Sequence, residues 1–246
     1  MVKKYNSYIA PVRPISTDYN NTSIILLGSM NYKMKSYGPK QLLKLNCNKT
    51  FIEHQIGCIK TVFPKSDIIL SIGQDADKVI KNKPDNLKIV ENQLWETTNE
   101  VEYARLALNA TNAKHVIIIN SDVYFDTDVL NQIKGVPYSF LLYDDSGRLP
   151  ENEIGLTIAE KYVTYFSYKM MSKWCHIAQL YNDDIAILSN ILSDKTRKKQ
   201  YLSEAFNSFV EKRPIKAERI LSSKLYRIET SKDLEKIKNE TKNIDS

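Results

Sequence analysis

The sequence predicts an α/β protein, a three-layer sandwich in which helices cover both faces of a mainly parallel mixed sheet. One observation is a series of short apolar runs that are rich in β-branched residues and have turn residues at both ends, a pattern typical of buried strands. These runs are 23–28, 67–73, 87–92, 115–122 and 138–144. Another is that helical patterns separate most of these runs, as in sheets with helices on both faces. Finally, 246 residues with 42% apolar residues suffice for one large domain with a sizeable core.

The remaining elements continue this alternation along the chain. Apolar periodicity predicts helices over 49–63, 98–110 and 126–135. The later part of the chain is expected to form two strands within 154–166, a strand over 173–180, helices over 181–194 and 198–212, a last strand over 223–230, and a capped helix over 231–243. Residues 1–22 match no regular pattern, so we expect an N-terminal extension followed by one domain over 23–246.

Composition and charge exclude several classes of protein. No apolar run approaches the ~18 residues of a membrane span, and the first residues lack an apolar signal core, which predicts a cytoplasmic protein without a membrane partner. Cys47, Cys58 and Cys175 form no CxxC pair, so they are expected to be reduced thiols rather than zinc ligands. The net charge of +6 suits an anionic partner, and the absence of a long basic run makes nucleic acid the less favoured one.

Acidic residues follow two of the predicted strands. Asp122 ends the most apolar run, where a carboxylate could hold a hard cation such as Mg²⁺ or simply begin a turn. Glu229 ends the last strand and could reach the same ion if the two strands are neighbours. The alternative for Glu229 is a surface turn, in which Thr230 or Ser231 caps the final helix and Asp233 supports its first turn.

A second acidic motif lies at Asp126 and Asp128. The D-x-D pattern is typical of metal-binding glycosyltransferases, but it also opens the helix over 126–135. A helix N-cap with a favourable first-turn charge therefore explains it more simply.

Lysines gather in the loop after the first strand. Lys33, Lys35 and Lys40 lie at the edge of the sheet that Asp122 also occupies, because the carboxyl ends of parallel strands meet there. Pro39 restricts the backbone beside Lys40. A triphosphate is the natural partner for these lysines, although they could equally solvate an exposed loop.

The order of these motifs resembles one known superfamily. The segments "IILLGSMNYKMKSYGPKQLLKL", "FIEHQIGCI", "VENQLWETTNEVEYARLAL", "VIIINSDVYFD" and "LYRIETSKDLEKIK" are similar to motifs of the nucleotidyltransferases that make nucleotide sugars and CDP-amino alcohols. That superfamily carries an A-G-x-G-x-R-M loop, a P-K, a G-D after the central strand and a late I-D-T-x-x-D-L. The chain's length and "WETTNEVEYA" are most similar to the phosphocholine cytidylyltransferase type.

The resemblance implies a GT-A-like, Rossmann-related fold and a reaction in which an acceptor phosphate attacks the α-phosphorus of an NTP and pyrophosphate leaves. It implies catalytic roles for Lys33 and Lys40, and Mg²⁺ held by Asp122 and Glu229. The nucleotide-binding residues that it implies are Leu27, Gly28, Ser29, Met30, Asn31, Asn92 (or Glu91 in its place) and Asn99. CTP with a small phosphorylated acceptor is the favoured substrate pair, and a homo-oligomer is possible.

Two alternatives remain open. One is a GT-A glycosyltransferase that uses Asp126 and Asp128 with a nucleotide sugar. The other is a non-catalytic nucleotide-binding descendant, since Ser29 and Asn31 stand where the superfamily has glycines. For the acceptor, the candidate aromatic cage around a cationic head group is Tyr162, Tyr165, Tyr168 and Trp174, and ordinary packing is the alternative for each of them.

Overall fold

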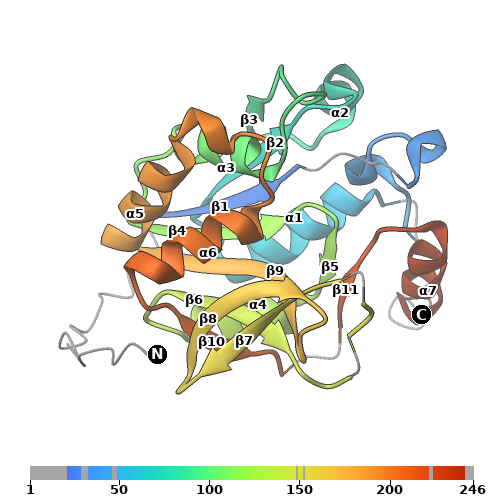
Figure 1. Ribbon diagram of the computed structural model, residues 1–246. Helices are drawn as coiled ribbons and strands as arrows, with labels where there is room; N and C mark the ends of the chain where they lie inside the picture. The colour runs from blue at the N-terminus through green and yellow to red at the C-terminus, as the bar shows by residue number, and fades with distance from the viewer. Residues whose placement is uncertain are drawn as a thin grey trace.

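The computed structural model describes residues 21–28, 33–45, 49–147, 149–151, 153–221 and 224–241 (Figure 1). The expected extension over 1–22 lies outside the described residues except for its last two positions. Ser29, Met30, Asn31 and Cys47 also lie outside them. None of the helices in the described ranges has the length and apolar character that crossing a membrane requires. A cytoplasmic location stays a prediction.

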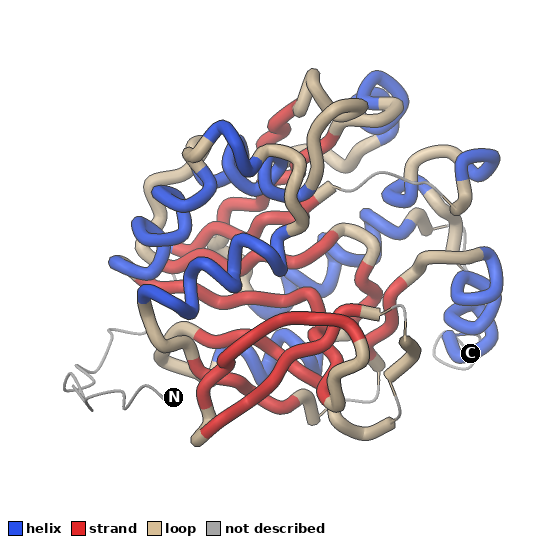
Figure 2. Tube along the Cα trace, in the orientation of Figure 1, coloured by secondary structure: helices blue, strands red, loops and turns tan. Residues whose placement is uncertain are grey.

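In the described part of the chain, nine strands form one mixed sheet (Figures 1 and 2). In spatial order they are β3 (Lys88–Glu91), β2 (Asp67–Ile72), β1 (Thr22–Leu27), β4 (His115–Asn120), β9 (Ser172–Tyr181), β6 (Phe140–Asp144), β10 (Lys216–Arg219), β8 (Tyr162–Tyr168) and β7 (Ile154–Ala159). Strands β3, β2, β1 and β4 pair in parallel, and so do β6 and β10. The pairs β4–β9, β6–β9, β10–β8, β7–β8 and β7–β9 are antiparallel.

The mixed α/β sheet is therefore as predicted, but antiparallel pairing is more extensive than expected. One of the antiparallel pairs is a hairpin with a short connection. Strands β7 and β8 are joined by Glu160 and Lys161, both with positive φ (50° and 72°), as in the tight turns that favour antiparallel hairpins. Neither residue is the Gly, Asn or Asp that usually signals such a turn, so the sequence predicted two strands in this region but not the turn that joins them.

A second, two-stranded sheet consists of β5 (Val123–Phe125) and β11 (Leu225–Arg227), which pair antiparallel. Strand β5 begins immediately after the turn that ends β4, so this small sheet holds the late part of the chain against the end of the central strand (Figure 1). The late strand is shorter than the expected 223–230, and β4 ends at Asn120 rather than at 122.

Helices cover both faces of the main sheet. On one face lie α3 (Glu100–Leu108), α5 (Asp183–Leu192) and α6 (Leu202–Lys212); on the other lie α1 (Phe51–Val62) and α4 (Thr127–Lys134). The remaining helical segments are α2 (Ala76–Asn82), α7 (Ser231–Thr241), η2 (Lys35–Tyr37), η3 (Lys40–Leu42) and η5 (Lys195–Arg197). Neither α2 nor β10 was expected, because α2 buries only Val79 and β10 is the half-buried, charged segment "KAER".

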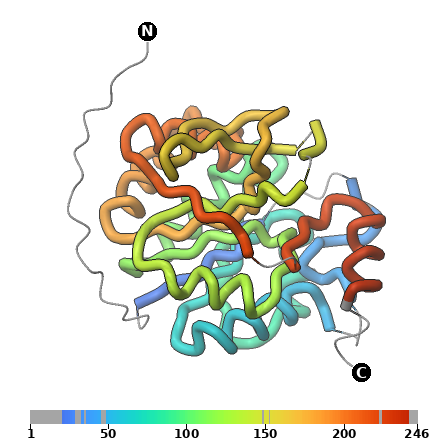
Figure 3. Tube along the Cα trace, turned by 90° about the horizontal axis from the view of Figure 1, so that it is seen from below, coloured from blue at the N-terminus to red at the C-terminus, as the bar shows by residue number. Residues whose placement is uncertain are grey.

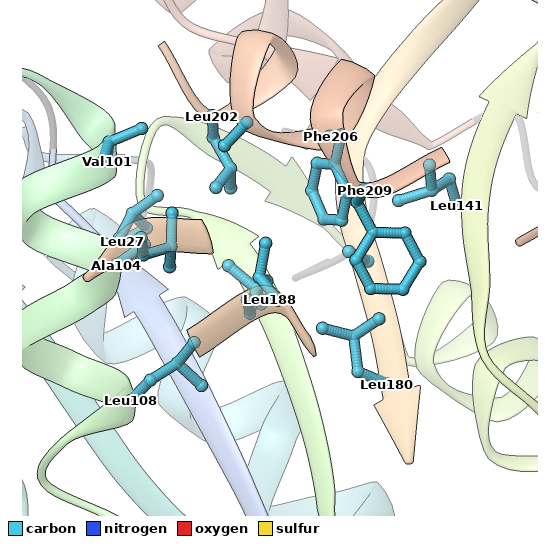
Figure 4. Packing of buried hydrophobic residues seen from close by; sticks show 14 of the residues in the cluster. Leu27, Val101, Ala104, Leu108, Leu141, Leu180, Leu188, Leu202, Phe206 and Phe209 are labelled. Carbon is cyan, nitrogen blue, oxygen red and sulfur yellow. The ribbon is translucent and has the colours of Figure 1, made fainter. Parts of the chain in front are cut away.

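The buried strand β1 shows how the two cores are separated. Ile25 and Leu27 contribute to the core beneath α3, α5 and α6, whereas Ile24 and Leu26 contribute to the core beneath α1 and α4. Figure 4 shows Leu27 together with side chains from α3, α5 and α6. A strand that is apolar on both faces can only lie in the interior of such a sandwich, which explains why β1 and β4 are central.

Helix α7 lies beside the segment 33–45, as Figures 1 and 3 show. A third apolar cluster joins them, in which Leu234 and Ile237 of α7 gather with Met34 and Leu43. This packing brings the lysines after β1 close to the residues just before α7.

Gly28 gives a test of how closely β1 and β2 are packed. A Cβ at position 28 would lie 2.3 Å from the carbonyl oxygen of Ser71, which is backbone and cannot turn away. We expect Gly28→Ala to lower the free energy of unfolding by about 1–3 kcal/mol, measured by urea denaturation. A Cβ at Gly57, on the exposed side of α1, would meet no atom within 4 Å, so Gly57→Ala should instead stabilise by about 0.4–1 kcal/mol. Equal effects at both glycines would contradict this account.

Candidate functional site

A pocket of about 220 Å³ lies beyond the carboxyl end of β4. Five of its charged lining residues come from three distant parts of the chain, and a sixth, Glu100, comes from the start of α3. Lys33 and Lys40 come from the segment after β1, Asp122 from the turn after β4, and Arg227 and Glu229 from the end of β11 and the residues after it. The remaining lining residues are Asn99, Glu100, Ile154, Tyr168, Trp174, His176, Tyr201 and Ser203.

The turn that carries Asp122 is fixed by backbone hydrogen bonds on both sides. The Ser121 N–H donates to the Leu27 carbonyl, and the Ile228 N–H donates to the Asp122 carbonyl, each at 2.8 Å. The first bond ties the turn to β1 and the second ties it to the segment after β11. Asp122 is completely buried as a result.

Lys40 is the closest cationic partner of Asp122. Its Nζ lies 3.0 Å from Asp122 Oδ2, and its side chain is almost completely buried. Gly38 has a φ of +76°, Pro39 precedes the short η3 turn, and the next residue, Gln41, donates to Ser121 Oγ at 3.0 Å. The Gly-Pro-Lys sequence therefore turns the chain so that Lys40 points into the protein rather than into solvent.

Arg227 is the second cation on Asp122. In the β5–β11 register it lies opposite Val123, the residue after Asp122. Its Nε lies 3.3 Å from Asp122 Oδ2, and its Nη1 lies 2.9 Å from Glu229 Oε1. Burial alone would raise the pKa of Asp122, but Arg227 and Lys40 outweigh burial and hold that pKa below its usual range. Asp122 is therefore ionised.

Glu229 lies at the mouth of the pocket, where a third of its side chain is exposed. Its second carboxylate oxygen pairs with Lys33, whose own side chain is about half exposed. The structure brings Asp122 and Glu229 together: both contact Arg227 and line one pocket.

The carboxylate oxygens can be tested as ligands for the Mg²⁺ that the resemblance implies. Asp122 Oδ2 and both oxygens of Glu229 carry cationic partners, and within the described residues only Asp122 Oδ1 is without one. The described ranges also contain no group of three or more His, Cys, Asp or Glu side chains placed to hold a metal ion. Since Mg²⁺ favours several oxygen ligands in near-octahedral geometry, this arrangement does not fit an ion held by both carboxylates. The assignment of these two residues as metal ligands stays a prediction.

His176 and Glu100 are buried polar residues that line the floor of the pocket, and the side chain of Asn120 contacts both of them. Across the β6–β9 pair, Leu141 faces Ala178 and Tyr143 faces Trp174, so β9 bulges here, and His176 takes a left-handed φ of +55°. His176 Nε2 accepts from Arg227 Nη1 at 3.2 Å. Burial, with Arg227 beside it, keeps the pKa of His176 well below its usual range, so the ring is neutral.

Glu100 connects this floor to two helices. It accepts from Asn120 Nδ2 and from the backbone N–H of Leu202, at the start of α6, both at 3.0 Å. Burial raises the pKa of Glu100. Glu100 therefore fixes the relative positions of β4, α3 and α6 around the pocket.

The other residues implied as nucleotide contacts occupy different environments. Asn99 lines the pocket and caps α3 through its side chain. Asn92 is buried, and its amide bonds to Thr98 Oγ1 and to the Leu94 N–H, within its own loop. Leu27 contributes its side chain to the core and its carbonyl to Ser121. The nucleotide-binding roles of these residues and of Gly28 stay predictions.

Two of the expected helix caps are present. Asp126 caps α4 by accepting from the N–H groups of Asp128 and Val129, as expected of an N-cap. Asp233 accepts from the Thr230 N–H at 2.7 Å, and its own N–H donates to Thr230 Oγ1, so the final helix is capped as predicted. Neither Asp126 nor Asp128 is among the described residues that line the pocket.

Of the four aromatic cage candidates, Tyr168 and Trp174 line the pocket, whereas Tyr162 and Tyr165 are not among its described lining residues. Trp174 also packs edge-on against Phe166 and Phe206 in the core. Tyr201, which was not predicted, adds a third aromatic side chain.

The sequence analysis did not identify Arg227 as a site residue. A signal was available, since Arg227 lies two positions before Glu229, and residues two apart on an extended chain share a face. His176 and Glu100 gave no comparable signal, because their positions depend on a bulge and on helix packing.

No protein-family model matches the chain, and no curated protein matches it by sequence. Solved structures match its fold. The CTP:phosphocholine cytidylyltransferase from Streptococcus pneumoniae superposes with a TM-score of 0.71 at 17% identity, covering 90% of this chain and 99% of that one. The nucleoside-diphosphate-sugar pyrophosphorylase from Vibrio cholerae gives a TM-score of 0.68 at 13% identity, covering 88% and 99%. HddC from Yersinia pseudotuberculosis, complexed with GMP-PN, gives 0.64 at 20%, covering 90% and 100%. The chain therefore has the fold of the nucleotidyltransferase superfamily that its sequence resembles.

Proposed function

We propose that the protein transfers a nucleoside monophosphate from an NTP to a small phosphorylated acceptor and releases pyrophosphate. The observation that carries this proposal is the convergence of Lys33, Lys40 and Arg227 in one pocket of a chain with this fold. Three carboxyl groups, those of Asp122, Glu229 and the buried Glu100, share this lining, so the cation most available to an anionic ligand is the half-exposed Lys33.

In the proposed reaction, an oxygen of the acceptor phosphate attacks the α-phosphorus of the NTP. A new P–O bond forms, the bond to the β-phosphate bridging oxygen breaks, and pyrophosphate leaves with the electron pair. Catalysis of this kind depends on positioning and on neutralising charge that develops on the phosphoryl oxygens. We assign that neutralisation to Lys40, which Asp122 holds in place, and binding of the leaving phosphates to Lys33, which is exposed enough to move from Glu229 to a ligand.

The aromatic residues of the pocket support a small acceptor. Tyr168, Trp174 and Tyr201 share the lining with the cationic residues, and aromatic faces attract quaternary ammonium groups within about 6 Å. CTP with a phosphorylated amino alcohol is therefore the pair that we favour, in keeping with the phosphocholine-type resemblance. A sugar 1-phosphate with another NTP is the nearest alternative within the same reaction.

A non-catalytic nucleotide-binding protein is the second candidate. It is favoured by the engagement of both lysines, since Lys33 and Lys40 are each paired with a carboxylate. The glycosyltransferase alternative has less support, because Asp126 serves as a helix cap.

Pyrophosphate release tests the reaction and the acceptor together. We expect release with CTP plus phosphocholine, and less with UTP, dTTP or GTP plus a sugar 1-phosphate. Each pair is to be measured with Mg²⁺ and with EDTA. Release only with a sugar phosphate would overturn the amino-alcohol assignment. Binding of nucleotides without release from any pair would favour the non-catalytic candidate.

Lys40→Met tests the charge assigned to the transition state. Loss of this ammonium group should lower kcat by about 100-fold or more. Lys44→Met is the matched control: Lys44 is an exposed lysine of the same segment and should leave kcat nearly unchanged. Since removal of one member of a buried ion pair also destabilises the fold, thermal unfolding must accompany the assay, and Lys40→Arg keeps the charge if Lys40→Met does not fold. Full activity of a folded Lys40→Met protein would remove Lys40 from the mechanism.

A further inference from the structure

Arg227 lies between the two carboxylates that the resemblance assigns to a metal ion. Its Nε contacts Asp122 and its Nη1 contacts Glu229, so one planar guanidinium group bridges both side chains. The third contact of the guanidinium, to His176 Nε2, is with a neutral ring. Arg227 thus occupies the position in which a divalent ion would contact both carboxylates.

Backbone geometry, and not only side-chain choice, keeps Arg227 there. The β5–β11 ladder places it opposite Val123, and the Ile228 N–H bonds to the carbonyl of Asp122. Only 18% of its side chain is exposed. A divalent ion that replaced it would have to move a buried cation away from two opposite charges, which is costly unless that cation finds new partners.

The chemistry of arginine makes the positive charge at this position permanent. A guanidinium group does not lose its proton at any pH that a protein tolerates, and its planar fork suits contacts to two carboxylates. The charges of Lys40 and Arg227 on Asp122 already exceed the single negative charge of that carboxylate. A bare Mg²⁺ approaching Asp122 Oδ1 would therefore meet two cations and one free oxygen.

We propose that Arg227 is the built-in counter-cation of this site, and that the protein binds polyphosphate without a divalent ion at Asp122 and Glu229. The choice of polyphosphate rests on the proposed function, whereas the claim about the two carboxylates does not. Arg227 is a binding residue in this account, together with Lys33 and Lys40.

A Mn²⁺ titration tests the claim about the carboxylates directly. Mn²⁺ is added to the nucleotide-free protein, and bound ion is measured by the loss of the free-ion electron paramagnetic resonance signal. Wild type should bind Mn²⁺ only weakly, whereas Arg227→Gln, which removes the cation that bridges the two carboxylates and leaves Lys40 and Lys33 in place, should bind at least about tenfold tighter. Arg219→Gln is the matched control, because Arg219 is an exposed arginine paired with Asp145, and it should behave as wild type. Equal Mn²⁺ affinity in wild type and a folded Arg227→Gln protein would overturn the proposal.

A second measurement needs no variant and covers the case in which Arg227→Gln does not fold. Inorganic tripolyphosphate is titrated into wild type by calorimetry, in EDTA and in Mg²⁺. We expect affinities that agree within about threefold, and a loss of tenfold or more in EDTA would contradict the proposal. If tripolyphosphate binds in neither buffer, the proposed function fails. The Mn²⁺ titration of wild type still decides the claim about Arg227: tight Mn²⁺ binding overturns that claim, and weak Mn²⁺ binding supports it.

Discussion

The buried charge of Asp122 is the constraint on which the rest of the site depends. A carboxylate with no exposed surface remains ionised only when cations compensate for the lost water, and here Lys40 and Arg227 do so. Meeting that requirement fixes the turn after β4, the short helical turn that carries Lys40, and the strand that carries Arg227. The same requirement orients two cations toward the pocket, so the charges that stabilise the fold are also the ones to which we assign anion binding.

The main sheet was largely predictable because its central strands are apolar on both faces. Runs such as "VIIIN" have few other stable positions in a protein of this size, and their turn residues mark where they end. The outer strands of the sheet, β10, β8 and β7, were harder to predict. Strand β10 is charged and half-buried, so its burial depends on the neighbours that it pairs with rather than on its own pattern. The hairpin of β7 and β8 turns on two residues with positive φ that are poor turn formers, and this conformation is imposed by strand pairing.

The site was predictable where side-chain chemistry coincides with a strand end. Asp122, Lys40, Lys33 and Glu229 met that condition, and the structure places them around one pocket. Arg227 was overlooked because its burial arises from its pairing with Asp122, 105 residues earlier in the chain. His176 depends on a bulge in β9, which leaves no mark in the order of residues. Long-range contacts, rather than local propensity, therefore determine what the pocket binds.

The attachment of β11 and α7 to the rest of the domain affects how the protein is made. Lys40 and Asp122 leave the ribosome well before Arg227, so the parallel strands β1 to β4 of a nascent chain can pair while the pocket still lacks the late cation. During that interval Leu234 and Ile237 of α7 do not yet pack against the cluster that contains Phe51 and Tyr124. The apolar surface that α7 later covers then faces solvent. Chaperones and proteases that recognise exposed apolar surface can therefore distinguish a chain that lacks this packing from one that has it.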